Sequence, residues 1–244
     1  MIKMSMTTLS RILKNTFVRG SLIFTVATFL GSLINYLFNI VVAKKLGPTG
    51  FGEITALFSY TTIFSVPMTV ITMVIIQKIG SNTTRGLAYA LTLEQWFLTK
   101  LKKWWLLLIP FLFLTPFIQK LTNLSFYSSV SIVPFVMIGF VGAYYAALLQ
   151  GLHLFGWISA LGTIAVILKL TGALVITNVE WGVLLIIVFL FISTASAIIG
   201  SFIILRTKSK GSTLIQSKLK RRVLGSVFQK QVIVTFFSIL GLTL

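Results

Sequence analysis

Apolar stretches of about 20 residues recur along this chain, and each is long enough to cross the hydrocarbon core of a bilayer as a helix. We expect membrane spans at residues 21–43, 54–76, 101–121, 130–149, 155–176 and 181–205. Hydrophobic residues make up 57% of the sequence and charged residues 10%, a balance that cannot cover a soluble domain with polar side chains. The sequence therefore predicts an all-α, polytopic membrane helix bundle.

A seventh apolar stretch begins near residue 232 and has too few residues before Leu244 to cross a bilayer. We therefore expect this chain to be the N-terminal portion of a longer protein. The chain has no cysteine, which excludes disulfides and thiolate metal sites within it.

The net charge of +18 is distributed unevenly along the chain. Basic residues cluster before the first span, after the second and after the sixth, whereas the alternate loops contain only Lys44, Lys45 and Lys120. By the positive-inside rule, the N-terminus is predicted to be cytoplasmic in a multi-pass protein of the cell membrane. This topology accounts for the charge, so no nucleic-acid partner is expected.

Polar side chains form a stripe along each of the first two spans. Steps of three and four residues place each set on one helical face. The stripes are Ser21, Thr25, Thr28, Ser32, Asn35 and Asn39, followed by Thr55, Ser59, Thr62, Ser65, Thr69 and Thr72. Such stripes either pack helices together or line a water-filled cavity. Two amides on one face favour the cavity, whose predicted lining is Thr28, Ser32, Asn35, Asn39, Ser59, Thr62 and Thr69.

Lys169 is the basic residue within the fifth predicted span, where an ammonium costs about 2.5–3.5 kcal/mol on insertion scales. Its side chain either reaches the nearer membrane surface or points into a cavity between helices. Gly162, Ala165 and Gly172 lie on the same face and leave space for a long side chain. We include Lys169 in the predicted cavity lining.

The acidic residues and the histidine all fall near predicted membrane boundaries. Glu53 begins the second span, where a helix dipole favours a carboxylate, and Glu94 and Glu180 are expected to be solvated. His153 lies alone in a short turn. This inventory offers little for acid–base chemistry or metal binding, so we expect neither an enzyme, a metal site nor a resident cofactor.

Two stretches resemble a known family. "AKKLGPTGFGEI", with Gly47, Pro48, Phe51 and Gly52, resembles the A-R-x-L-G-P-x-x-F-G-x-Y corner of polysaccharide exporters, although residue 54 is isoleucine instead of the common tyrosine. "AALLQGLHLFGWISALGTIAVIL" resembles the connection between the fourth and fifth spans of the same family. These exporters are lipid-linked oligosaccharide flippases of the O-antigen and teichoic acid type, within the multidrug/oligosaccharidyl-lipid/polysaccharide exporter superfamily.

The resemblance implies two six-helix lobes around a cavity that opens alternately to each side. Residues 1–205 would form the first lobe, 206–231 a basic cytoplasmic linker, and 232–244 the start of the second lobe. The implied substrate is a polyprenyl-pyrophosphate-linked oligosaccharide, and the implied partners are membrane lipids and glycan-assembly enzymes. The coupling ion is not specified. Two alternatives stay open: a cation-coupled multidrug exporter of the same superfamily, and a non-transporting scaffold of a glycan-assembly complex.

Overall fold

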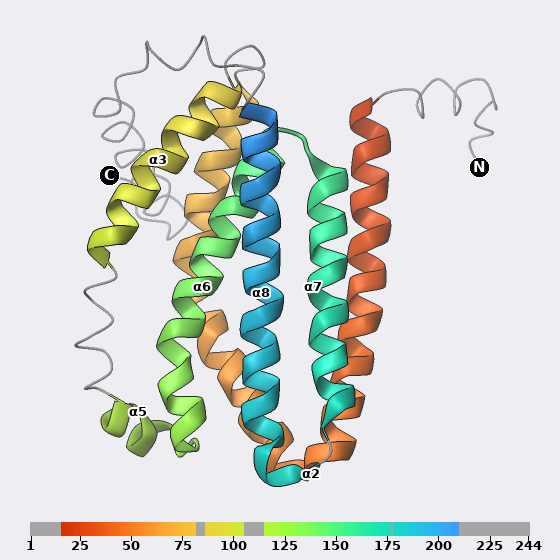
Figure 1. Ribbon diagram of the computed structural model, residues 1–244, viewed down its shortest axis with the longest axis vertical. Coiled ribbons are helices and arrows are strands. Elements are labelled where there is room, and N and C mark those ends of the chain that lie inside the picture. Colours follow the sequence, from red (N-terminus) through yellow and green to blue (C-terminus); the bar gives the residue numbers. More distant parts are fainter. Residues whose placement is uncertain (1–15, 82–85, 105–114, 177, 210–244) are drawn as a thin grey trace, which may run out of the picture.

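The computed structural model describes residues 16–81, 86–104, 115–176 and 178–209, and all of its regular secondary structure is helical. The elements are α2 (Thr16–Gly80), α3 (Gly86–Trp104), α5 (Thr115–Thr122), α6 (Phe126–Gly151), α7 (Phe155–Val175) and α8 (Val179–Ser209). Figure 1 shows the long helices running side by side along one axis.

Four described helices are long and apolar enough to cross a membrane: Gly20–Ile63, Phe126–Gly151, Phe155–Val175 and Trp181–Ser209. The chain is therefore a membrane-embedded helical bundle, as the sequence predicts. The expected third span, at residues 101–121, falls largely on residues 105–114, which lie outside the described part. The predicted linker beyond Ser209 and the predicted seventh helix also lie outside it.

Helix α2 contains both of the first two predicted spans and reverses direction at Gly47, whose φ is 68° and ψ is −175°. A residue with a Cβ strongly disfavours these backbone angles for steric reasons, so glycine is required at this position. The next glycine, Gly50, is crowded, because a Cβ added to it would lie 2.7 Å from Leu46 Cβ. We call residues 16–46 the first limb of α2 and residues 48–80 the second limb.

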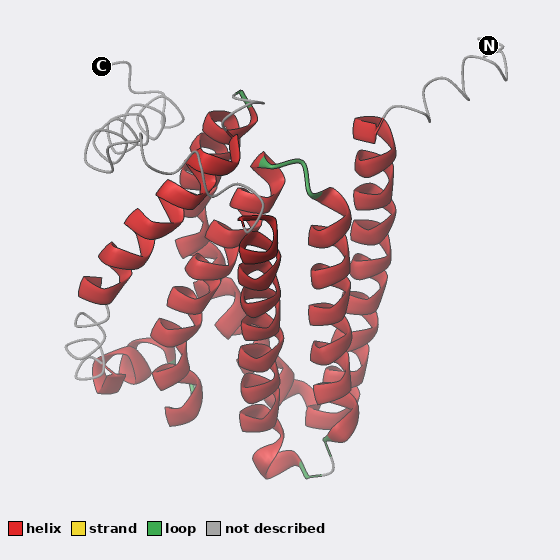
Figure 2. Cartoon of the chain, turned by 45° about the horizontal axis from the view of Figure 1, so that its top comes forward, coloured by secondary structure: helices red, strands yellow, loops and turns green. Residues whose placement is uncertain are grey.

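The two limbs diverge from Gly47 and pack against different helices. The first limb contacts α7, the second limb contacts α6, and α8 contacts both α6 and α7 (Figures 1 and 2). We call the end near Gly47 the corner end, and the end with Lys78, Arg206 and Lys208 the basic end.

Two apolar clusters hold this arrangement together. The cluster toward the corner end joins both limbs to α6, α7 and α8, and includes Phe38, Val42, Leu57, Ala173 and Ile186. The cluster toward the basic end joins the second limb to α3, α6 and α8, and includes Ile75, Leu93, Phe97, Leu148 and Leu205.

Candidate functional site

From Thr25 onward, the hydroxyl groups of both stripes donate hydrogen bonds to carbonyls of their own helix. In the first limb, Thr25, Thr28 and Ser32 donate to carbonyls one turn earlier, at 2.8–3.0 Å. In the second limb, the same pattern extends through Thr55, Ser59, Thr62, Ser65, Thr69 and Thr72, at 2.6–3.1 Å. The donors are therefore satisfied locally, and the oxygen lone pairs stay available to an outside donor.

A recess of about 250 Å³ lies between the first limb and α7. Its polar lining comes from Thr28, Ser32 and Asn35 on α2 and from Ser159 and Thr163 on α7. The hydroxyl of Ser159 is buried and has no hydrogen-bond partner within the described part of the chain. The recess therefore contains an unmet polar group in addition to the exposed stripe oxygens.

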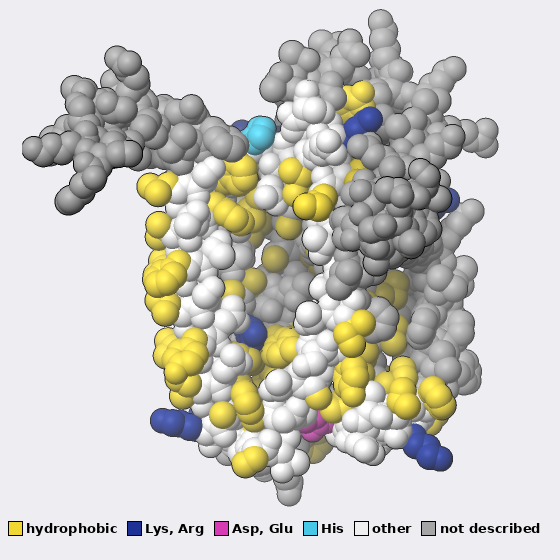
Figure 3. Space-filling model, turned by 180° about the vertical axis from the view of Figure 1, so that it is seen from behind, with side chains coloured by type: hydrophobic (Ala, Val, Ile, Leu, Met, Phe, Trp, Pro, Cys, Tyr) yellow, Lys and Arg dark blue, Asp and Glu magenta, His cyan; other side chains and the backbone are white. Residues whose placement is uncertain are grey.

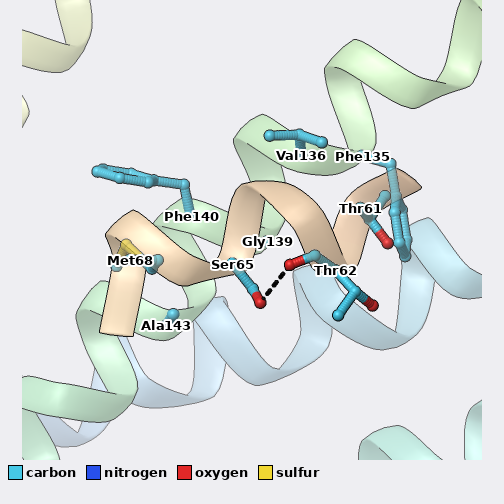
Figure 4. A pocket seen from close by; sticks show the side chains of 9 residues that line it. All are labelled: Thr61, Thr62, Ser65, Met68, Phe135, Val136, Gly139, Phe140 and Ala143. Carbon is cyan, nitrogen blue, oxygen red and sulfur yellow. Dashed lines mark hydrogen bonds between the residues drawn. The ribbon is translucent and has the colours of Figure 1, made fainter. Parts of the chain in front are cut away.

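A second recess, of about 260 Å³, lies between the second limb and α6. Thr61, Thr62 and Ser65 supply its hydroxyls, and Phe135 and Phe140 of α6 flank them (Figure 4). This recess has more apolar lining than the stripe pattern suggests, because Met68, Val136, Gly139 and Ala143 complete it.

Not every residue of the predicted lining lies in these recesses. Thr28, Ser32, Asn35 and Thr62 do. Asn39, Ser59 and Thr69 are exposed on the limbs but do not line either recess. Ser159 and Thr163 were missed by sequence analysis, although their spacing of four residues, which places both hydroxyls on one face of the same span, was a usable signal.

Lys169 extends between the two limbs of α2. Its Nζ donates a hydrogen bond to Asn35 Oδ1 at 3.0 Å, and lies 4.1 Å from the centre of the Phe38 ring and 4.5 Å from that of Phe58. The amide of Asn35 is in turn fixed by a hydrogen bond from Nδ2 to the Gly31 carbonyl, at 3.1 Å. The side chain points into the bundle, which is the second of the two orientations considered from sequence.

This position links the two recesses. Asn35 lines the first recess, whereas Phe58 packs against Phe135 of the second, with ring centres 6.4 Å apart. Figure 3 shows the face formed by the limbs hollowed midway along the bundle, with a basic side chain inside the hollow. Lys169 thus lies where the two polar surfaces converge.

The contacts of Lys169 in the described residues are one amide oxygen and two aromatic rings, none of which is an anion. Aromatic faces attract a cation, and this attraction strengthens when the cation is desolvated. An ammonium has three N–H donors, and Asn35 uses one of them. The site therefore offers a preorganised, unneutralised cation to a ligand that enters the hollow.

The corner residues Gly47, Pro48, Phe51 and Gly52 lie at the far end of the limbs from the basic end. The adjacent residues Lys45, Leu46 and Glu53 connect this corner to α7, α8 and α6. Lys45 Nζ donates to the Leu174 carbonyl and, at 2.9 Å, to the Ile176 carbonyl at the end of α7, where a cation also complements the helix dipole.

Glu53 and Leu46 complete that attachment. Glu53 Oε1 accepts a hydrogen bond of 2.9 Å from the Ser125 backbone N–H, at the N-cap of α6. Leu46 packs onto Gly182 of α8, where an added Cβ would lie 2.2 Å from Leu46 Cδ2. The corner is therefore a structural hub, and Glu53 stabilises α6 in addition to beginning the second limb.

The expectation that Glu94 is solvated is wrong. Glu94 is completely buried, accepts a hydrogen bond of 3.2 Å from the Tyr145 hydroxyl, and pairs with Arg206 at 3.5 Å. It lies on α3, which is not among the four candidate spans. Burial raises the pKa of its carboxyl above the ordinary value, and Arg206 and then Tyr145 offset part of this effect. The side chain of Glu180 lies outside the described part.

The described residues contain no group of three or more His, Cys, Asp or Glu side chains that could hold a metal ion. Comparison of the chain with protein-family models, with curated proteins and with solved structures gives no match. Any functional assignment therefore depends on the chemistry of the bundle itself.

Proposed function

We propose that this chain belongs to a flippase that moves polyprenyl-pyrophosphate-linked oligosaccharides across the cell membrane for cell-surface polysaccharide synthesis. The observation that supports this proposal most strongly is Lys169, whose ammonium lies inside the bundle between the two limbs and is not neutralised by a carboxylate among its described contacts. The resemblance of the Gly47 corner to polysaccharide exporters agrees with it.

The chemistry of such a substrate matches the two recesses. A pyrophosphate brings negative charge, and a charge-assisted hydrogen bond to an ammonium is among the stronger polar contacts in proteins. Sugar hydroxyls are donors, and the stripe oxygens have lone pairs free to accept from them. Together these groups replace hydration that the glycan must lose, while the lipid tail stays in the bilayer.

Orientation follows from the two ends of the bundle. Lys78, Arg206 and Lys208 lie at the basic end, and Lys44 and Lys45 lie at the corner end. In the sequence, extended basic clusters precede α2 and follow α8, so we assign the basic end, and the N-terminus, to the cytoplasm. Rocking of this lobe against a second lobe would expose the hollow to each side in turn.

The two alternatives fit less well. A scaffold would use its polar stripes for contacts between helices, but the stripe hydroxyls donate within their own helix. A cation-coupled multidrug exporter needs a carboxylate to attract a cationic drug or ion at the cavity. The charged group that the structure places between the two recesses is the Lys169 ammonium instead, and the buried Glu94 pairs with Arg206 outside their lining.

Glycan export in cells tests this function. The natural full-length protein is replaced by Lys169→Gln, Lys169→Arg or Lys44→Gln, each at matched membrane abundance. We expect Lys169→Gln to reduce export strongly, Lys169→Arg to retain part of it, and Lys44→Gln, which alters an exposed lysine at the corner end, to behave normally. Full export by Lys169→Gln would contradict the proposed role of the ammonium.

A further inference from the structure

A second polar cluster lies at the basic end, away from the recesses. Glu94 of α3 is fully buried, with Oε1 accepting from the Tyr145 hydroxyl of α6 at 3.2 Å and Oε2 lying 3.5 Å from Arg206 Nη2 of α8. The side chain of Arg206 is 40% exposed, whereas that of Glu94 is 0% exposed. The buried anion is thus balanced by one cation that is itself in contact with water.

The surroundings of Glu94 provide little other compensation. Within the described residues, the titratable or charged groups placed against it are Arg206, Tyr145 and Tyr144. The Tyr144 hydroxyl is buried without a hydrogen-bond partner in the described part, and its ring stacks on Phe97, with centres 3.9 Å apart. The second limb of α2 contributes apolar side chains to this cluster, among them Val74, Ile75 and Ile79.

Such a carboxylate has two stable arrangements. It is ionised and held by Arg206, or it is protonated and neutral, in which case burial in an apolar cluster costs far less free energy. Burial already raises its pKa above the ordinary value. A metal cation is disfavoured as a ligand because it would lie beside the Arg206 guanidinium, whereas a proton adds to the carboxylate and removes the negative charge.

We propose that Glu94 is a reversible proton-binding site and that its protonation releases Arg206, detaching the last turn of α8 from α3. A proton from water adds to the carboxylate at Oε2, and the ion pair is lost. Tyr145 continues to donate to Oε1, now a carbonyl oxygen. Arg206 then has as its described contact the ring of Phe202, 4.9 Å away, and otherwise faces water.

The sign of the effect follows from the charges. At high pH, Glu94 is ionised and holds α8 to α3; as the pH falls through the folded-state pKa, the attachment is lost. Proton binding at Glu94 does not require the proposed glycan substrate. In the flippase proposed above, the same site would allow a proton gradient to change the attachment of α8 to α3. Its test therefore uses the complete protein in lipid nanodiscs without any glycan.

Infrared difference spectroscopy during a pH titration detects the carbonyl stretch of a protonated carboxylic acid. Comparison with the spectrum of Glu94→Gln separates the contribution of Glu94 from those of all other carboxyl groups in the complete protein. We expect a band that grows as pH falls, disappears in Glu94→Gln and persists in the matched control Glu53→Gln. Its midpoint should move to higher pH in Arg206→Gln and in Tyr145→Phe, since each removes a group that favours the charged carboxylate.

Hydrogen exchange of residues 204–209 provides the second measurement, after correction for the pH dependence of intrinsic exchange. Protection of this turn should fall with pH in the unmodified protein and be low at every pH in Glu94→Gln. An undiminished infrared band in Glu94→Gln, or protection independent of pH in the unmodified protein, would overturn the proposal. If Glu94→Gln does not fold, Arg206→Gln and Tyr145→Phe test the proposal instead. An unchanged midpoint of the infrared titration in both variants would contradict the assignment of the band to Glu94.

Discussion

Replacing Lys169 with glutamine should weaken binding of a polyprenyl pyrophosphate without unfolding the bundle. Glutamine keeps an amide N–H that can donate to Asn35, but it removes the charge that lies between the Phe38 and Phe58 rings. A hydrogen bond to a charged group contributes about 1.5–3 kcal/mol. Since about 1.4 kcal/mol corresponds to a tenfold change, the dissociation constant should rise about 10- to 150-fold.

The assay is equilibrium binding of radiolabelled polyprenyl pyrophosphate to the complete protein in nanodiscs of neutral lipid. Lys44→Gln removes an exposed lysine and serves as the control for net charge. Unlabelled polyprenyl pyrophosphate should compete with the label, whereas the uncharged polyprenol should compete poorly. Equal affinity of Lys169→Gln and the unmodified protein, at equal thermal stability, would refute the reasoning that the ammonium recognises the phosphate.

The remaining predictions concern the corner. Gly47→Ala should destabilise the fold by about 1–3 kcal/mol, because a Cβ is disfavoured at φ 68° and ψ −175°. Gly52→Ala is the matched control, since an added Cβ there meets nothing within 4 Å; both are measured as thermal unfolding midpoints in detergent, and equal midpoints would contradict the strained conformation. Lys45→Met should increase hydrogen exchange at the end of α7, where Lys45 holds the carbonyls of Leu174 and Ile176. Unchanged exchange there would show that this cap contributes nothing measurable.

Sequence patterns predicted the features that depend on local geometry. Apolar runs of sufficient length predicted the four long apolar helices of the described part, and the first two predicted spans lie on either side of Gly47, the residue with positive φ at the reversal of α2. Both effects arise from residues adjacent in the chain. The cost of placing Lys169 in a span also marked that residue as unusual before its surroundings were known.

Features that depend on packing between distant segments were not predictable in the same way. Lys169 and Asn35 are separated by 134 positions, so only the packing of α7 on the first limb brings them together. Glu94 was misjudged because its burial depends on α6 and α8, not on its neighbours in α3. The hydroxyl groups of the polar stripes also need no partner from another helix, since they donate hydrogen bonds to carbonyls of their own helix.

The central claim is that the hollow between the limbs contains water and is positively charged by Lys169. It is tested most directly by single cysteines in this chain, which has none of its own, with any cysteine elsewhere in the complete protein replaced by serine. Thr62→Cys lies in a recess, and Leu57→Cys replaces a side chain that is 0% exposed. Their rates of reaction with anionic and cationic water-soluble thiol reagents are compared in the complete protein.

We predict that Thr62→Cys reacts rapidly and that Leu57→Cys does not. At Thr62→Cys, the anionic reagent should react faster than the cationic one, and the ratio of these two rates should fall when Lys169→Gln is added. Failure of Thr62→Cys to react from water, or a reagent ratio unaffected by Lys169→Gln, would contradict the account.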